Sequence, residues 1–296
     1  MQTGSGEPRV KLANILAATD FSTASHSAVL HAISLARHYG ATLYLVHIAG
    51  SDASRREVDE AWREGHRLTT DLLVSGHLRG ISHKLIVRQG DIWEGLAPVV
   101  EENTVDLVVV GTRGRSGLSK MLLGSVAERI FRQATCPVLT VGPNATGPDF
   151  AGESNREPGL RRMLYATDFT AHSLHAAPYA LSLTQHYQAH LIVLHVIQDT
   201  AAASPLQKSR LLDEAKCRLR ELISALSPMQ FEPEFIVGFG TPAPRILDVA
   251  VEKLPDVIVL GVTHPLPSGV LAGRRWTTAS EVAAKAACPV LTIRAT

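Results

Sequence analysis

The chain has 296 residues, enough for two ordinary domains, and its 45% hydrophobic and 19% charged residues are typical of globular proteins. Lys and Arg number 29 against 28 Asp and Glu, so no strong net charge favours nucleic acid or an anionic membrane. No apolar run approaches the roughly 18 residues that a membrane helix needs, and the polar N-terminus does not resemble a secretion signal. We therefore expect a cytoplasmic protein without nucleic-acid or membrane partners.

One sequence pattern occurs in both halves of the chain. Residues 16–21 (LAATDF) recur as residues 164–169 (LYATDF). Residues 136–141 (CPVLTV) recur as residues 288–293 (CPVLTI). Because the order of these segments is kept, the sequence predicts two copies of one domain.

The expected domain boundaries follow from these repeats and from composition. The first domain is predicted over residues 9–142 and the second over residues 160–296. Residues 143–159 are rich in Gly, Pro and polar side chains, which is typical of a linker.

Apolar runs and helical periodicities alternate along the first copy. In chain order, the sequence predicts a strand over 12–18, a helix over 24–38, a strand over 42–48, a helix over 53–77, a strand over 82–87, a helix over 91–102, a strand over 106–111, a helix over 125–134 and a strand over 137–141. Such alternation favours right-handed βαβ units and a parallel sheet. If the first and fourth strands are neighbours at the reversal of winding, their carboxyl ends flank a crevice for a ligand. Asp20 and Gly111 would then meet, with Ile48 beside them.

A glycine-rich loop connects the fourth strand to the next helix. Residues 111–125 read GTRGRSGLSKMLLGS, so three glycines and a serine stand between an apolar run and a helical pattern. Glycine lets the backbone approach an anion closely, and a helix start offers N–H groups without acceptors. Ser125 can either cap the helix or donate its hydroxyl to a phosphate. The loop therefore indicates a phosphate site, although an ordinary strand–helix loop explains a generic glycine-rich segment equally well.

The spacing G-x2-G-x9-G-S from Gly111 to Ser125 resembles the nucleotide loop of the ATP-binding branch of the universal stress protein family. Residues 18–22 (ATDFS) resemble the first strand-end signature of that family, and residues 136–139 (CPVL) fit its last strand. The resemblance covers almost the whole chain. It implies two tandem Rossmann-like domains, of the adenine nucleotide alpha hydrolase-like type, each a five-stranded parallel sheet with helices on both faces.

The resemblance also implies a set of ligand contacts in the first domain. The nucleotide-binding residues implied are Asp20, Ile48, Val110, Gly111, Gly114, Gly124, Ser125 and Val126. Arg115 is added because its guanidinium group can pair with a phosphate, although the motif does not include it. Asp20 would hold the ribose hydroxyls or lie beside a bound metal, for which Mg²⁺ with ATP is the expectation. Helix capping by Asp20 or Ser22, and core packing by Ile48 and Val110, are the competing explanations. We expect neither a metal site made by the protein alone nor a catalytic residue.

The second copy departs from this pattern. His264 stands where the second glycine is expected, and Trp276 replaces the third. A tryptophan there would crowd a phosphate close to the backbone. We therefore expect the second domain to support the first and to bind nucleotide weakly or not at all. The residues of such a weak second site would be Asp168, Val196, Gly261 and Thr277.

Two classes of function stay open, and a third is disfavoured. The first is an ATP-binding regulatory or stress-response protein, with slow ATP hydrolysis at most and an unknown protein partner. The second is a nucleotide-independent dimerising scaffold that binds a protein. An ATP pyrophosphatase is disfavoured, because residues 18–22 (ATDFS) replace the Ser-Gly-Gly-x-Asp-Ser loop of those enzymes.

The last strand of each copy is expected at a sheet edge. In the family that the chain resembles, such edges pair between domains. Residues 138–141 and 290–293 could accordingly pair within the chain and make a pseudo-dimer, which would also protect both edges. Further association into a homodimer is compatible with the same sequence.

Overall fold

A computed structural model describes residues 10–112, 123–143, 145, 159–198, 204–226, 232–262 and 277–294. The elements in chain order are β1 (Asn14–Ala18), α1 (Thr23–Tyr39), β2 (Thr42–Ala49), α2 (Arg55–Val74), β3 (His83–Gln89), α3 (Ile92–Glu102), β4 (Leu107–Gly111), α4 (Ser125–Gln133), β5 (Val138–Val141), β6 (Arg162–Ala166), α5 (Ala171–Tyr187), β7 (His190–Ile197), α6 (Pro205–Leu226), β8 (Glu234–Phe239), α7 (Pro242–Lys253), β9 (Val257–Val262), α8 (Thr278–Lys285) and β10 (Val290–Arg294). The predicted alternation of strands and helices is confirmed. Within the described ranges, every helix is too short or too polar to cross a membrane.

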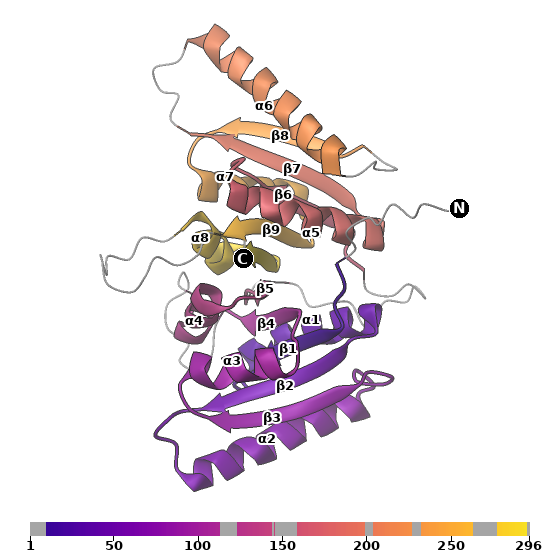
Figure 1. The fold of residues 1–296 in the computed structure, drawn as a ribbon, viewed down its shortest axis with the longest axis vertical. Helices are drawn as coiled ribbons and strands as arrows, with labels where there is room; N and C mark the ends of the chain where they lie inside the picture. Colours follow the sequence, from indigo (N-terminus) through magenta and orange to yellow (C-terminus); the bar gives the residue numbers. More distant parts are fainter. Residues whose placement is uncertain are drawn as a thin grey trace.

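The strands form one continuous ten-stranded sheet in the order β3-β2-β1-β4-β5-β10-β9-β6-β7-β8. Figure 1 shows the two repeats one above the other, with α2 and α6 at opposite ends of the long sheet. All strand pairs within a repeat are parallel, and β1 lies between β2 and β4. The prediction that the first and fourth strands are neighbours where the winding reverses is therefore confirmed.

The two repeats meet through an antiparallel pairing of β5 with β10, as the sequence predicted. Two buried threonines, one from each repeat, reinforce this pairing by the same contact. Thr140 Oγ1 donates to the carbonyl of Val290 at 3.1 Å, and Thr292 Oγ1 donates to the carbonyl of Val138 at 3.2 Å. Because each strand covers the open edge of the other, the sheet has no exposed edge at its centre.

The side chain of Arg294, at the end of β10, crosses from the second repeat to the first. Its Nη1 donates to the carbonyl of Arg132 at 2.6 Å and its Nη2 to the carbonyl of Phe131, also at 2.6 Å. Both carbonyls belong to the last turn of α4, where backbone acceptors lack intrahelical donors and a positive charge is favoured. The second repeat therefore fixes the C-terminal end of α4.

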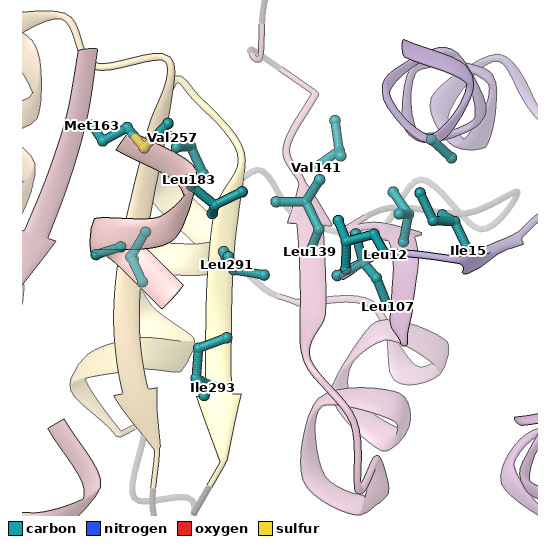
Figure 2. Close-up of a cluster of buried hydrophobic side chains, with 14 of the residues drawn as sticks. Leu12, Ile15, Leu107, Leu139, Val141, Met163, Leu183, Val257, Leu291 and Ile293 are labelled. Atoms are coloured by element: carbon teal, nitrogen blue, oxygen red, sulfur yellow. The ribbon is translucent and has the colours of Figure 1, made fainter. Parts of the chain in front are cut away.

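The helices cover the sheet in two layers. The core on one face includes α1, α2, α5 and α6, and the core on the other face includes α3, α4, α7 and α8. Each core continues from one repeat into the other. Figure 2 shows this continuity on the first face, where Leu139 of β5 and Leu291 of β10 lie on neighbouring strands beside Leu183 of α5.

The C-terminal ends of α1 and α5 also join the repeats, through four aromatic rings. The ring of His38 stacks on that of Tyr187 with centroids 4.0 Å apart, and the ring of Tyr39 stacks on that of His186 at 4.6 Å. Burial raises the pKa of the Tyr39 hydroxyl, which therefore stays protonated. The contact is pseudo-symmetric, because each helix contributes a His–Tyr pair at its end.

Gly261, near the end of β9, lies directly under the first turn of α5. A Cβ atom at this position would come within 2.1 Å of the carbonyl oxygen of His172 and 2.5 Å of Cα of Ser173. Both neighbours are backbone atoms and cannot move aside as a flexible side chain would. Packing of the helix against the sheet therefore explains this glycine without a ligand.

We expect Gly261→Ala to lower the free energy of unfolding by about 3 kcal/mol, because the added methyl group overpacks the helix–sheet contact. Gly40→Ala is the control, since Gly40 has a φ of 63° but no heavy atom within 4 Å of the added Cβ. The control should cost about 1 kcal/mol through backbone strain alone. Urea unfolding of both variants measures the difference, and an equal loss in the two would contradict the packing explanation.

Candidate functional site

The candidate site of the first repeat lies at the carboxyl edge of β1, β2 and β4. Ala18, the last residue of β1, is level with Val46 of β2 and with Val110 of β4. Asp20 lies two residues after Ala18 at this edge, Ile48 is the second-last residue of β2, and Gly111 ends β4. The structure therefore brings these predicted residues to one edge, at the reversal of winding where open α/β sheets bind ligands.

Asp20 organises the turn that connects β1 to α1. One of its carboxylate oxygens accepts hydrogen bonds from the N–H of Ser22 at 3.0 Å and from the Ser22 hydroxyl at 2.5 Å. Ser22 is the N-cap of α1, and its Oγ accepts from the N–H of Ser25 at 3.2 Å. Of the two residues considered for capping, Ser22 caps the helix, and Asp20 positions the cap.

A strained phenylalanine fixes the same turn. Phe21 has a φ of 61°, which is rare for a bulky residue, and its ring stacks on His47 at 4.6 Å. His47 Nδ1 lies 2.8 Å from the carbonyl oxygen of Thr19, so this histidine is a structural partner of the turn. The second repeat has the same arrangement, with Phe169 at a φ of 61° beside His195. This rigidity positions the aspartate at the end of the first strand in both repeats.

The side chains of Ile48 and Val110 pack in the core. Val110 is 3% exposed, and Ile48 contacts α3, where a Cβ added to Gly95 would lie 3.0 Å from Ile48 Cγ2. The packing explanation therefore holds for both side chains. Their backbones still form the rim at the ends of β2 and β4.

The start of α4 lies beside the end of β4. The N–H of Gly124 donates to the carbonyl of Thr112 at 2.8 Å, and this bond connects the helix to the strand. Gly124 is the N-cap, and no side chain among the described residues caps the helix. Ser125 and Val126 are its first two residues, so Ser125 does not act as the cap. The first-turn N–H groups have no intrahelical acceptors and form the positive end of the helix dipole.

Thr112 is a polar group at this edge that sequence reasoning missed. Its side chain is 2% exposed, and Oγ1 has no hydrogen-bond partner among the described residues. A buried hydroxyl without a partner is costly and unusual in a folded protein. The feature of the sequence that could have pointed to Thr112 is its position directly after Gly111. The carbonyl of the same residue accepts from Gly124, the N-cap of α4, so this unpartnered hydroxyl belongs to the residue that connects β4 to the helix start, and a hydroxyl of this kind suits a ligand with oxygen acceptors such as a phosphate.

An ion pair at the same edge was also missed. Arg129 of α4 pairs with the Asp91 carboxylate, which also accepts from the N–H of Trp93 at 3.2 Å as the N-cap of α3. This pair joins α3 to α4 one turn beyond the helix start. No sequence pattern pointed to it, because 38 residues separate the partners.

The corresponding helix in the second repeat starts differently. Thr277 is the N-cap of α8, and its Oγ1 accepts from the N–H of Ser280 at 3.2 Å. Ser280 Oγ donates in turn to the carbonyl of Thr277 at 2.9 Å. Thr277 corresponds to Ser125 in the repeat, yet it caps its helix while Ser125 lies inside its own. The first-turn N–H that Thr277 caps in α8 therefore has no capping side chain among the described residues in α4.

The other second-repeat residues have structural roles. Asp168 Oδ1 accepts from the N–H of Thr170 at 3.0 Å, and Val196 is 9% exposed in the core. Partial burial favours the protonated Asp168 carboxyl, but hydrogen bonds from Thr170 and Ser173 outweigh it and lower the pKa. Asp168 is thus ionised at neutral pH and engaged in its own turn.

Several predicted residues lie outside the described residues. These are Gly114, Arg115, His264 and Trp276. In the described ranges, no group of three histidine, cysteine or carboxylate side chains is arranged to hold a metal ion.

Comparison with known proteins relates both repeats to one family. Residues 11–142 and residues 159–294 each match the Universal stress protein family. A universal stress protein of Methanocaldococcus jannaschii is 31% identical over 146 residues, which are 43% of this chain and 80% of the relative. The universal stress protein YxiE of Bacillus subtilis is 30% identical over 146 residues, 43% of this chain and 97% of the relative.

A solved structure extends the likeness to the whole chain. A universal stress protein from Archaeoglobus fulgidus superposes with a TM-score of 0.73 over 97% of each chain, at 20% sequence identity. At that identity the likeness shows the fold alone, which is shared from end to end. Together with the two family matches, it follows that this chain belongs to the universal stress protein family and carries two such domains in tandem.

Proposed function

We propose that the first repeat binds an adenine nucleotide, with ATP as the expected ligand, and that the protein has a regulatory role in stress response. The observation that carries this proposal is the start of α4, which no described side chain caps and which follows β4, the strand paired with β1 just before Asp20. The partnerless Thr112 hydroxyl beside it supports the same assignment. Family membership supports it as well.

Each part of the site has a proposed role that its chemistry suits. The Asp20 carboxylate accepts hydrogen bonds from ribose hydroxyls. The helix start presents N–H groups to phosphate oxygens, and Ser125 adds its hydroxyl. The proposed nucleotide contacts are Asp20, Ile48, Val110, Gly111, Gly114, Arg115, Gly124, Ser125 and Val126. When bound, ATP with Mg²⁺ would place charged phosphates at the start of α4. The number of phosphates present could then change the conformation of the protein.

The proposed second site is weak or absent. The Thr277 hydroxyl already accepts a hydrogen bond from a first-turn N–H of α8. The close packing of α5 explains why a glycine is needed at position 261. Asp168 remains able to accept hydrogen bonds, but the loop before α8 brings Trp276 where the first repeat has a glycine. The second repeat then serves mainly to support the first, as the Arg294 contact with α4 suggests.

Turnover is expected to be slow at most. The sequence pattern identifies neither a general base nor a water-positioning group, which a dedicated ATPase needs. A nucleotide-independent dimerising scaffold that binds a protein partner is the second candidate. The observation that favours it is the β5–β10 pairing, which joins the repeats through strand and threonine hydrogen bonds.

Ser125→Ala should weaken ATP binding about tenfold or more, because it removes a hydroxyl donor to a charged phosphate. It should leave the free energy of unfolding unchanged, since Gly124 and not Ser125 is the N-cap. Thr277→Ala, at the corresponding position, should show the opposite pattern. It should leave ATP binding unchanged and cost about 1 kcal/mol of stability through loss of the cap.

Isothermal titration calorimetry and urea unfolding measure the two effects. Unchanged ATP affinity in Ser125→Ala would contradict the phosphate role, and no detectable ATP binding by the wild-type chain would favour the scaffold.

Asp20→Asn should weaken ATP binding about tenfold, because an amide is a poorer acceptor for ribose hydroxyls than a carboxylate. The amide oxygen can still accept from Ser22, so the turn should persist. Asp168→Asn is the matched control and should leave ATP binding unchanged.

The effect of the control variant Asp168→Asn on stability can also be measured as a function of pH. Because folding lowers the pKa of Asp168, this carboxylate stabilises the fold above its unfolded pKa, and that stability is lost as pH falls through the lower folded pKa. The difference in free energy of unfolding between wild type and Asp168→Asn should therefore shrink as the pH falls below the folded pKa of Asp168. Equal loss of ATP affinity in both aspartate variants would show that the two repeats bind alike.

A further inference from the structure

A cavity of about 710 Å³ lies between the two repeats, away from the candidate nucleotide site. Its walls come from α1 and the starts of β4 and β5 in the first repeat, and from α5, the end of α7 and the starts of β9 and β10 in the second. This volume is within the range of about 300–1,000 Å³ that is usual for small-molecule pockets. None of its described lining residues belongs to the proposed nucleotide site.

The deep part of the cavity is apolar. Leucines from both repeats line it, and each is at most 6% exposed: Leu12, Leu107, Leu139, Leu183 and Leu291. Figure 2 shows these side chains on both sides of the β5–β10 pairing. An apolar interior of this kind favours a hydrocarbon body over a polar one.

The apolar lining continues outward to the surface at the end of α7. Val251 and Leu254 line the cavity and are 73% and 61% exposed, among the most exposed large hydrophobic residues that the structure describes. An exposed apolar patch next to a leucine-lined interior is typical of a binding mouth. A chain-like apolar ligand could therefore remain in contact with nonpolar atoms along its whole path.

The rim of the cavity carries positive charge. Arg161 and Arg162 line it with exposed side chains, and in the described part of the chain neither guanidinium forms an ion pair. Asp256 also lines the cavity, but its Oδ2 accepts from the backbone N–H groups of Arg161 and Arg162 at 2.7 and 2.8 Å. The Nζ of Lys285 is paired with Glu281 at 2.6 Å. The two arginines are thus the groups that can meet an anion.

We propose that this cavity binds an amphipathic monocarboxylate of the fatty-acid class. The alkyl chain lies among the leucines between the repeats, and the carboxylate pairs with Arg161 and Arg162, whose planar guanidinium groups suit carboxylate geometry. The ligand contacts both repeats, so its binding depends on the β5–β10 joint and not on the nucleotide.

The test uses the full chain and laurate below its micelle concentration, with binding followed by isothermal titration calorimetry. Laurate should bind with one site per chain, and dodecan-1-ol about tenfold more weakly, because it lacks the charge that meets the arginines. The double variant Arg161→Glu with Arg162→Glu should lose laurate affinity by about tenfold or more. Arg210→Glu on α6, an exposed arginine outside the cavity, is the charge control and should bind as wild type does.

Ala250→Trp tests the cavity itself, since Ala250 lines it from α7 and is only partly buried. The added ring should obstruct the cavity from its α7 wall, beside Val251 and Leu254, and abolish laurate binding. Circular dichroism and thermal unfolding, without any nucleotide, verify that both variants are folded. Absence of laurate binding by the wild-type chain, or binding that neither variant alters, would overturn the proposal. Equal affinity for dodecan-1-ol would overturn the role of the arginines.

Discussion

The antiparallel pairing of β5 with β10 is the contact on which the rest of the structure depends. It turns two parallel sheets into one, covers the central edge strand of each, and merges the cores on both faces. Thr140 and Thr292 make the same buried bond from opposite sides, and Arg294 extends the joint to the last turn of α4. The second repeat therefore holds in place the helix whose other end forms the candidate site.

Duplication followed by divergence explains why the two copies differ at the site but not in the fold. The Asp–Phe turn and its histidine occur in both repeats, because they fix how the first strand enters its helix. Gly261 persists because α5 packs against it. The copies differ in the loop sequence, where His264 and Trp276 replace glycines, and at the helix start, where Thr277 caps α8 while no described side chain caps α4. The capping position therefore differs by one residue between the two copies, and under the proposed function this leaves the start of α4 to the nucleotide.

Much of the fold followed from the sequence, because apolar periodicity and repeated segments report directly on strands, helices and their order. The pairing of the last strands followed from the family resemblance, and it also protects both edges. The capping shift was not, since Ser125 and Thr277 carry the same hydroxyl and only backbone geometry decides which one caps. The Arg129–Asp91 pair and the inter-repeat cavity depend on side chains distant in sequence, which periodicity does not encode.

The most direct measurement is the nucleotide content of the purified chain, released by heat and quantified by chromatography, for wild type and Gly114→Trp. We predict one adenine nucleotide per wild-type chain, either retained on purification or taken up with ATP and Mg²⁺, and none on the variant. Two nucleotides per chain would contradict the closed start of α8. No nucleotide on the wild-type chain, even after incubation with ATP and Mg²⁺, would contradict the proposed site altogether.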